Sequence, residues 1–139
     1  SQAELDNARA WVQAGGTFYA SDWEWELFEG IAPDALDFAA NPRIGTPLLV
    51  NATILDRDIR TMIGGSTARI RFDLSDWAMI QSVGSAVPLV EGPVFKGQNR
   101  PLAGIHVAGS GRMIYTSFHN DQQVTGDMQL ILYEMILSL

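Results

Sequence analysis

At the start of the chain, the spacing of the apolar positions changes from helical to strand-like and back to helical. Residues 3–14 carry apolar side chains at helical spacing, which predicts an amphipathic helix that ends at Gly15-Gly16. The β-prone run Thr17-Phe18-Tyr19-Ala20 follows, and Ser21-Asp22 is a typical N-cap for a second helix. The opening therefore predicts a helix, a short strand, a tight turn and another helix.

The middle of the chain changes from an interrupted pattern to a strand-like one. Residues 31–47 lose the apolar period and contain three prolines and one glycine, so we expect a long connection there. Residues 48–55 are β-prone, and residues 56–63 predict a short helix that ends at Gly64-Gly65. Alternating or β-prone runs predict further strands at residues 67–72, 77–83, 87–95, 102–107 and 112–118.

Two further signals complete the pattern. Ala108-Gly109-Ser110-Gly111 predicts a hairpin connection between the last two strands, because glycine tolerates positive φ. Thr125 is the expected N-cap of a final helix, and Asp127 suits its first turn. The apolar stripe of this helix consists of Met128, Ile131, Leu132, Met135 and Ile136.

Size and composition limit the possible classes of protein. With 139 residues, 47% of them hydrophobic, the chain can bury one sizeable core, so we expect a single domain over residues 1–139. The net charge of −7 argues against nucleic acid or an anionic membrane surface as a partner. The absence of cysteine excludes disulfides and a thiolate nucleophile. No motif indicates a cofactor or a metal ion, and no apolar run is long enough to predict membrane insertion.

The segment from Gly111 to Asp121 carries the most informative chemistry. A buried strand is predicted to end just before His119-Asn120-Asp121, so a histidine and a carboxylate lie at a strand end. In an open α/β sheet, ligands and catalytic groups gather at this edge. The sequence therefore predicts a site here.

Two segments of the chain resemble the class I glutamine-amidotransferase-like superfamily. They are Gly15 to Trp23, GGTFYASDW, and Gly109 to Asp121, GSGRMIYTSFHND. They are most similar to its ThuA-like branch, which is often associated with von Willebrand A-type domain proteins. The resemblance implies a flavodoxin-like, doubly wound α/β sheet, and we expect a β-rich insertion at about residues 46–100.

The same resemblance implies a site, and the sequence departs from the family there. The amidotransferases carry a cysteine at the strand-to-helix turn where this chain has Ser21-Asp22-Trp23, so hydrolysis of glutamine by a thiolate is excluded. Our first hypothesis is therefore a non-catalytic ligand-binding or protein-interaction module, with Asp22, Trp23 and Asn120 as ligand contacts. The alternative is a serine-type hydrolase of an ester or amide, in which Ser21 is the nucleophile, His119 the base and Asp121 the orienting acid.

Each of these residues also has a purely structural interpretation. Ser21 or Asp22 can serve mainly as a helix cap, and Asp121 can cap a turn. His119 can hold a loop through backbone hydrogen bonds. Trp23 and Trp25 cannot both face one core, so one of them lines a cleft or both cover the sheet edge.

The resemblance further implies that opening βα units precede this chain. We then expect the strand at residues 17–20 to have an unpaired side, or to pair with a missing N-terminal segment or a partner subunit. The alternative is that the β-rich middle, residues 67–95, covers the exposed edge.

Overall fold

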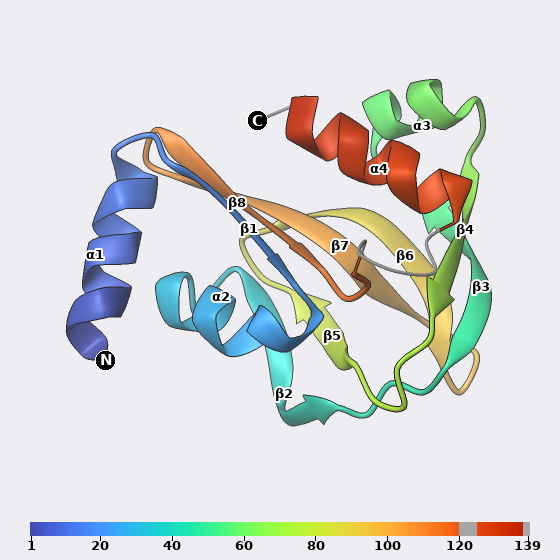
Figure 1. Ribbon diagram of the computed structural model, residues 1–139, viewed down its shortest axis with the longest axis horizontal. Coiled ribbons are helices and arrows are strands. Elements are labelled where there is room, and N and C mark those ends of the chain that lie inside the picture. Colours follow the sequence, from blue (N-terminus) through green and yellow to red (C-terminus); the bar gives the residue numbers. More distant parts are fainter. Residues whose placement is uncertain (120–124, 138–139) are drawn as a thin grey trace.

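The computed structural model describes residues 1–119 and 125–137, with helices packed on both faces of a sheet (Figure 1). The helices are α1 (Gln2–Gln13), η1 (Asp22–Glu24), α2 (Trp25–Ile31), α3 (Arg57–Ile63) and α4 (Gly126–Leu137). The strands are β1 (Thr17–Ser21), β2 (Leu36–Arg43), β3 (Leu48–Ile54), β4 (Thr67–Phe72), β5 (Ala78–Val83), β6 (Val87–Phe95), β7 (Gln98–Ala108) and β8 (Gly111–Thr116).

The main sheet is mixed and mostly antiparallel. Its six strands have the order β1-β8-β7-β6-β3-β4, and β1 with β8 is the one parallel pair. The remaining strands, β2 and β5, form a separate antiparallel pair with irregular register. A hairpin joins β7 to β8 as predicted, and Gly109 in it has a φ of 62°.

The prediction of a flavodoxin-like, doubly wound sheet of the amidotransferase-like type is wrong. Such a sheet is built from parallel strands joined by crossover helices, whereas the central strands here are joined as antiparallel neighbours. The β-rich stretch at residues 46–100 is also not an insertion beside the sheet, because it contributes β3, β4, β6 and the start of β7 to the sheet itself. The middle of the chain thus forms mainly antiparallel strands, whereas a doubly wound fold would have crossover helices between parallel strands there.

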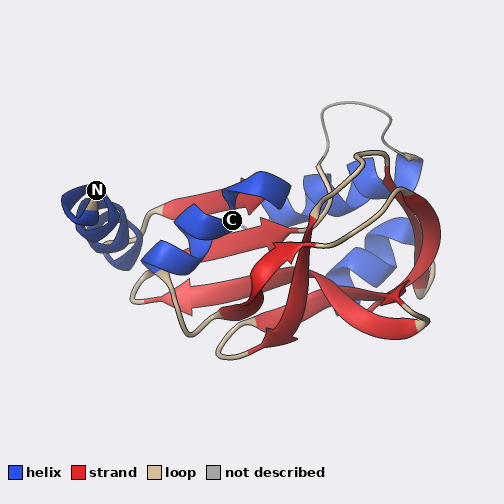
Figure 2. Ribbon diagram, turned by 90° about the horizontal axis from the view of Figure 1, so that it is seen from below, coloured by secondary structure: helices blue, strands red, loops and turns tan. Residues whose placement is uncertain are grey.

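Each face of the main sheet has its own core, and helices lie on either side of the strands (Figure 2). Helices α3 and α4 cover one face, where Ile59, Ile114 and Ile131 belong to one buried cluster. On the other face, Phe28 of α2, Phe38 of β2 and Tyr115 of β8 pack edge to face, with ring centroids 4.9 and 5.5 Å apart. Successive residues of β8 point to opposite faces, so this strand supplies both cores.

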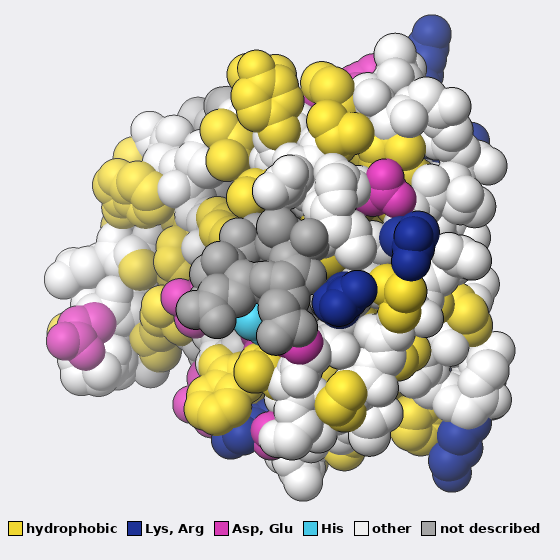
Figure 3. All heavy atoms as spheres, turned by 45° about the vertical axis from the view of Figure 1, so that its right-hand side comes forward, with side chains coloured by type: hydrophobic (Ala, Val, Ile, Leu, Met, Phe, Trp, Pro, Cys, Tyr) yellow, Lys and Arg dark blue, Asp and Glu magenta, His cyan; other side chains and the backbone are white. Residues whose placement is uncertain are grey.

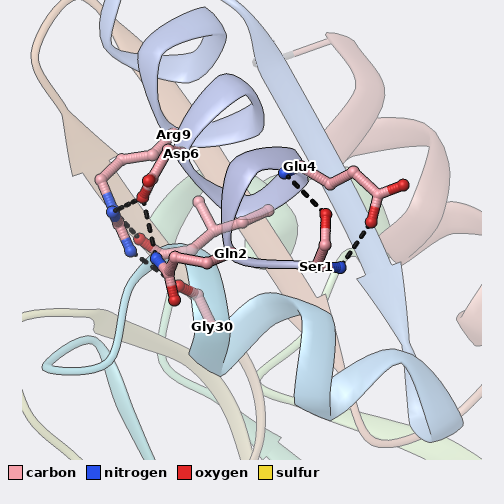
Figure 4. A network of polar contacts seen from close by, with 7 residues as sticks. Ser1, Gln2, Glu4, Asp6, Arg9 and Gly30 are labelled. Carbon is pink, nitrogen blue, oxygen red and sulfur yellow. Dashed lines mark hydrogen bonds and ion pairs between the residues drawn. The ribbon is translucent and has the colours of Figure 1, made fainter.

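Helix α1 is tied to the end of α2 by one arginine (Figure 4). The guanidinium of Arg9 donates to the carbonyls of Gly30 and Ile31, at 2.8 and 3.0 Å, and pairs with Asp6 at 2.9 Å. A cation at a helix C-terminus satisfies carbonyls that lack partners within the helix. Arg9 therefore orients the predicted N-terminal helix against the rest of the molecule.

Helix α3 has both of its predicted ends. Asp56 is the N-cap, and its carboxylate accepts hydrogen bonds from the N–H groups of Asp58 and Ile59. Gly64 ends the helix with a φ of 77°, a left-handed conformation that glycine adopts without strain. The predicted short helix and its end at Gly64 are therefore confirmed.

The predicted long connection over residues 31–47 is wrong, because β2 lies within it. Tertiary contacts hold this segment: β2 pairs with β5, and the indole N–H of Trp77 donates to the carbonyl of Thr46 at 2.9 Å. Trp77 also packs so closely on Gly45 that a Cβ at that position would lie 2.1 Å from the ring. Strand β2 therefore depends on distant partners that its own apolar pattern does not reveal.

Helix α4 covers the outer edge of β4. Thr125 caps the helix as predicted and also donates to the carbonyl of Arg69, while Asp127 accepts from the N–H of Arg69 at 2.7 Å. Most of the predicted apolar stripe faces the sheet, but Ile136 is 56% exposed, which corrects its assignment to the buried face. None of the described helices is long and apolar enough to cross a membrane.

Candidate functional site

The candidate site lies at the end of the parallel pair β1 and β8. Ser21, the last residue of β1, is the register partner of Thr116, the last residue of β8. The turn that begins at Ser21 and the segment that leads to His119 therefore both leave the sheet at the carboxyl ends of β1 and β8, although nearly a hundred residues separate them.

Asp22 occupies the strand-to-helix turn in a strained conformation. Its φ is 43°, in the left-handed region that few non-glycine residues adopt, and only 4% of its surface is exposed. Its Oδ1 accepts from the N–H of Ala78 at 2.7 Å, and its carbonyl accepts from the phenol of Tyr115 at 2.6 Å. The carboxylate of Asp22 thus anchors β5 to the turn.

Burial changes the acidity of this carboxyl group. It raises the pKa of Asp22 from 3.8 to about 6, while the Ala78 N–H, His119 and Arg43 lower the pKa and Asp76 raises it. These groups come from β2, from the segment between β4 and β5, from the first residue of β5 and from the segment that follows β8. Asp22 therefore titrates near neutral pH within a cluster of charged side chains.

His119 faces a carboxylate that the sequence did not single out as its partner. Its Nε2 lies 3.1 Å from Oδ1 of Asp73, and the two side chains are partly buried. In the described part of the chain, no hydrogen bond joins His119 to Ser21, whose backbone N–H donates to Glu24 at 2.8 Å. A carboxylate beside a ring nitrogen holds the imidazole ring in a fixed orientation.

A cation–π pair forms the exposed side of the site. Trp23 is 56% exposed, and the guanidinium of Arg43 lies 4.0 Å from the centre of its ring. Arg43 also pairs with Asp76 at 2.6 Å. Trp25 instead packs on Phe38, so the two tryptophans face different environments, as their spacing requires.

Figure 3 shows one face of the molecule, on which a histidine side chain is visible close to acidic side chains.

Two hydroxyl groups lie on the last residues before His119. The Oγ1 of Thr116 donates to the carbonyl of Phe118 at 2.6 Å and lies 3.0 Å from the phenol oxygen of Tyr19. The Oγ of Ser117 is buried and has no hydrogen-bond partner among the residues that the structure describes. A buried hydroxyl without a partner is uncommon and costs free energy of folding.

The structure brings together Ser21, Asp22 and His119 and places Trp23 on the surface beside them. Asn120 and Asp121 lie outside the described residues, so the proposed orienting acid and one proposed ligand contact have no structural account. Among the described side chains, no group of three histidines or carboxylates could hold a metal ion. The site offers a buried acid of raised pKa, a histidine–carboxylate pair and an exposed aromatic ring.

Sequence reasoning missed the contributions of Asp73, Asp76 and Arg43. Asp73 and Asp76 lie between the strands predicted at residues 67–72 and 77–83, where no site residue is predicted, and Arg43 lies in the predicted connection. The position of Asp73 directly after a predicted strand is the one signal that could have drawn attention to it. Its pairing with His119 spans 46 positions and arises only in the folded chain.

Comparisons with known proteins find structures of similar fold but assign the chain to no family. No protein-family model matches the chain, and no curated protein sequence matches it either. The resemblance to the amidotransferase-like superfamily therefore has no support from these comparisons.

Solved structures with a similar fold come from larger proteins. A cytoplasmic protein from Salmonella typhimurium is similar with a TM-score of 0.66 at 12% identity, and the match covers 97% of this chain and 59% of that one. A β-galactosidase from Rahnella sp. R3 has a TM-score of 0.59 at 20% identity, over 96% of this chain and 21% of that one. An exo-β-1,4-mannosidase from Opitutaceae bacterium strain TAV5 has a TM-score of 0.51 at 14% identity, over 98% and 20%. The chain thus shares its fold with a part of each of these proteins.

Proposed function

We propose that this chain is a non-catalytic protein-interaction module, which binds another polypeptide segment along the outer edge of β1. The observation that carries the proposal is the position of β1 in the sheet. It pairs with β8 on one side, and no other described strand lies on its other side. An open strand edge is a template for a further strand.

The register shows which backbone groups of β1 point outward. The N–H of Arg112 donates to the carbonyl of Gly16 at 3.1 Å, so Gly16 points toward β8. Successive residues of a strand direct their backbone groups alternately to its two sides, so the N–H and carbonyl of Thr17 are directed to the open edge. The N–H of Ser21, which bonds Glu24 rather than β8, follows the same alternation.

The two edge strands of the sheet, β4 and β1, differ in how their outer backbone groups are covered. At the β4 edge, Thr125 and Asp127 of the α4 terminus satisfy both backbone groups of Arg69. The β1 edge, Thr17–Ser21, carries no charged residue and no proline, which are the usual devices that prevent strand addition. The contrast supports β1 as the edge that receives a partner.

The size of the structural neighbours supports the same proposal. This chain spans about a fifth of the β-galactosidase and mannosidase chains and 59% of the Salmonella protein. Domains of this fold therefore occur inside longer polypeptides, where another segment can lie beside β1. The partner of the proposed module is an extended segment of a larger protein or of a second subunit.

A matched pair of edge substitutions tests the proposal. Thr17→Lys places a charge on the open edge, and Thr67→Lys places the same charge on β4, whose edge α4 covers. We expect the isolated chain to self-associate through its open edge in sedimentation velocity, and Thr17→Lys to weaken this association at least about tenfold while Thr67→Lys leaves it unchanged. A monomer at all concentrations, or equal effects of the two substitutions, contradicts the proposal.

A serine-type hydrolase that uses Ser21, His119 and Asp121 is the second candidate. The convergence of Ser21 and His119 at one sheet edge favours it, whereas the pairing of His119 Nε2 with Asp73 favours the non-catalytic module. A fluorophosphonate probe that labels activated serines separates the two candidates. The non-catalytic module predicts no labelling, whereas labelling that disappears in Ser21→Ala would establish the hydrolase.

A further inference from the structure

A small hollow lies apart from the site at the ends of β1 and β8. It is formed where the separate pair β2 and β5 meets the hairpin of β6 and β7, and its volume is about 180 Å³. Its lining residues are Ala39, Ile44, Met79, Gln81, Phe95 and Arg100. A hollow of about 150 Å³ is large enough for a benzene-sized group. The space therefore suits one small ring or a short branched alkyl chain.

The hairpin of β6 and β7 holds one side of the hollow in place. Its turn consists of Lys96 and Gly97, whose φ values are 50° and 76°, and Phe95 pairs with Gln98 across it. Two central residues of positive φ are typical of a type I′ turn, whose twist matches that of the strands it joins. Phe95 and Arg100 therefore lie beside a tight two-residue turn and not on a long loop.

Strand β5 forms the opposite side of the hollow. Met79 and Gln81 are two positions apart on this strand, so their side chains point to the same side of it. Met79 is buried in the core cluster that contains Ile114 and Ile131, whereas Gln81 is exposed. The hollow thus has an apolar inner wall at Met79 and a polar outer wall at Gln81.

Arg100 supplies the charge of the hollow. Its guanidinium lies 5.4 Å from the centre of the Phe95 ring and donates one long hydrogen bond, of 3.3 Å, to the side-chain oxygen of Gln98. Within residues 1–119 and 125–137, no carboxylate forms an ion pair with Arg100. A guanidinium carries five N–H donors in a planar fork that matches a carboxylate. Most donors of Arg100 are therefore available to a bidentate acceptor.

The charge around the hollow differs from that of the whole chain. The net charge is −7, yet the sequence contains no aspartate or glutamate between Glu91 and Asp121. Glu91 itself accepts a hydrogen bond from Asn99 at 3.3 Å and does not line the hollow. The ammonium group of Lys96 lies 5.4 Å from the Phe95 ring and adds a second cation at this end of the hairpin. Two cations without a lining carboxylate attract a negative ligand group and repel a positive one.

We propose that this hollow binds a small monocarboxylate, with its carboxylate on the guanidinium of Arg100 and its ring or branched alkyl group between Met79 and Phe95. The side-chain amide of Gln81 is a further donor for the carboxylate. The apolar part of the ligand gains free energy by leaving water, and the carboxylate stays at the outer side, where it keeps part of its hydration. No lining residue belongs to β1, so the test of this proposal is independent of the proposed strand addition.

Three probes of similar size test the charge requirement: benzoate, benzyl alcohol and benzylammonium. Methyl NMR of the full chain at pH 7.5 follows Ala39, Ile44 and Met79 in the hollow, with Ile31 of α2 as a reference outside it. Benzoate is expected to shift the three lining signals saturably and to bind about fivefold more tightly than benzyl alcohol, which corresponds to about 1 kcal/mol from a partly exposed ion pair. Benzylammonium is expected to leave the signals unchanged.

Variants assign the binding to this hollow. Arg100→Gln should weaken benzoate about fivefold, to the level of benzyl alcohol, and leave benzyl alcohol unaffected. Arg57→Gln makes the same change of charge on α3, outside the hollow, and should alter neither. Ala39→Leu fills the hollow and should abolish the binding of both probes, with its thermal midpoint as the check that it folds.

Several results would overturn the proposal. They are equal binding of benzoate and benzylammonium, equal effects of Arg100→Gln and Arg57→Gln, and the lack of a saturable shift of the lining methyl groups. Benzoate binding that persists in a folded Ala39→Leu variant would place the ligand elsewhere and contradict the assignment to this hollow.

Discussion

The phenol of Tyr115 donates a hydrogen bond of 2.6 Å to the carbonyl oxygen of Asp22, so a side chain of β8 holds the turn that follows β1. Asp22 has a positive φ there, a conformation that costs roughly 1–2 kcal/mol for a residue with a Cβ. A second hydrogen bond, from Ala78 to the Asp22 side chain, holds the turn from β5. Contacts from two distant strands thus maintain a strained residue at the candidate site.

Removal of the Tyr115 hydroxyl should lower the stability of the protein, because the strained turn at Asp22 loses one of its hydrogen bonds. Tyr115→Phe keeps the buried ring but leaves the carbonyl of Asp22 without its partner, so the free energy of unfolding should fall by about 1–3 kcal/mol in urea denaturation. Tyr133→Phe removes an exposed hydroxyl from α4 and should change it by less than about 0.5 kcal/mol. Equal effects of the two substitutions would mean that the Tyr115 bond does not stabilise the turn.

Asp22 should make the stability of the protein depend on pH. Because its pKa is raised to about 6 in the folded chain, the folded state favours the protonated carboxyl. The resulting stability is present below about pH 4 and is lost as the pH rises through 6. Asp22→Asn keeps an oxygen acceptor for Ala78 and cannot ionise. We expect the variant to match the wild type near pH 4 and to exceed it by about 1–3 kcal/mol at pH 7.5.

Urea denaturation at several pH values measures this difference. His119, Asp76 and Arg43 remain in both proteins, so the difference between the two stability curves reports mainly on Asp22. Curves that stay parallel from pH 4 to pH 7.5 would show that the Asp22 carboxyl titrates at its ordinary value.

The buried hydroxyl of Ser117 should be dispensable for folding. Its Oγ has no hydrogen-bond partner within residues 1–119 and 125–137, so Ser117→Ala removes a polar group that is unsatisfied there and should raise the free energy of unfolding by about 1 kcal/mol. Ser85→Ala is the matched control, because the Ser85 hydroxyl donates to the carbonyl of Asp34 at 3.1 Å, and its loss should be neutral or slightly destabilising. A destabilised Ser117→Ala would instead show that the hydroxyl has a partner in solution, such as a bound water.

The two faces of α4 should respond differently to truncation. Ile131 is fully buried against the sheet, so Ile131→Ala should cost about 2–5 kcal/mol of stability. Ile136, on the same helix, is mostly exposed, and Ile136→Ala should cost less than about 0.5 kcal/mol in thermal or urea unfolding. Similar losses for the two variants would mean that the outer face of α4 is also covered in solution.

Elements with local signals could be predicted from the sequence. The N-cap Asp56 and the C-cap Gly64 act within one turn of helix, and the alternation over residues 67–72 reports directly on the two sides of β4. Strand β2 could not be predicted in this way, because its segment contains Pro42 and its stability comes from pairing with β5.

The candidate site was predictable only in part. The sequence predicts that one strand ends near Ser21 and another just before His119. Because β1 and β8 are parallel neighbours, these two strand ends lie side by side in the structure. The partner of His119 was not predictable, because Asp73 approaches it from the end of β4. Nor could the sequence reveal that Asp22 is buried, since its environment is made by Ala78 and Tyr115, which lie 56 and 93 positions away.

The sequence by itself determined most helices and strands, their caps and the apolar faces that they bury, since hydrophobic period and capping act over a few neighbouring residues. The tertiary structure decided the order of the strands, the mixed sheet in place of a doubly wound one, and the raised pKa of Asp22. These properties depend on which distant segments pack together, and a strand-like pattern is compatible with several neighbours in either direction.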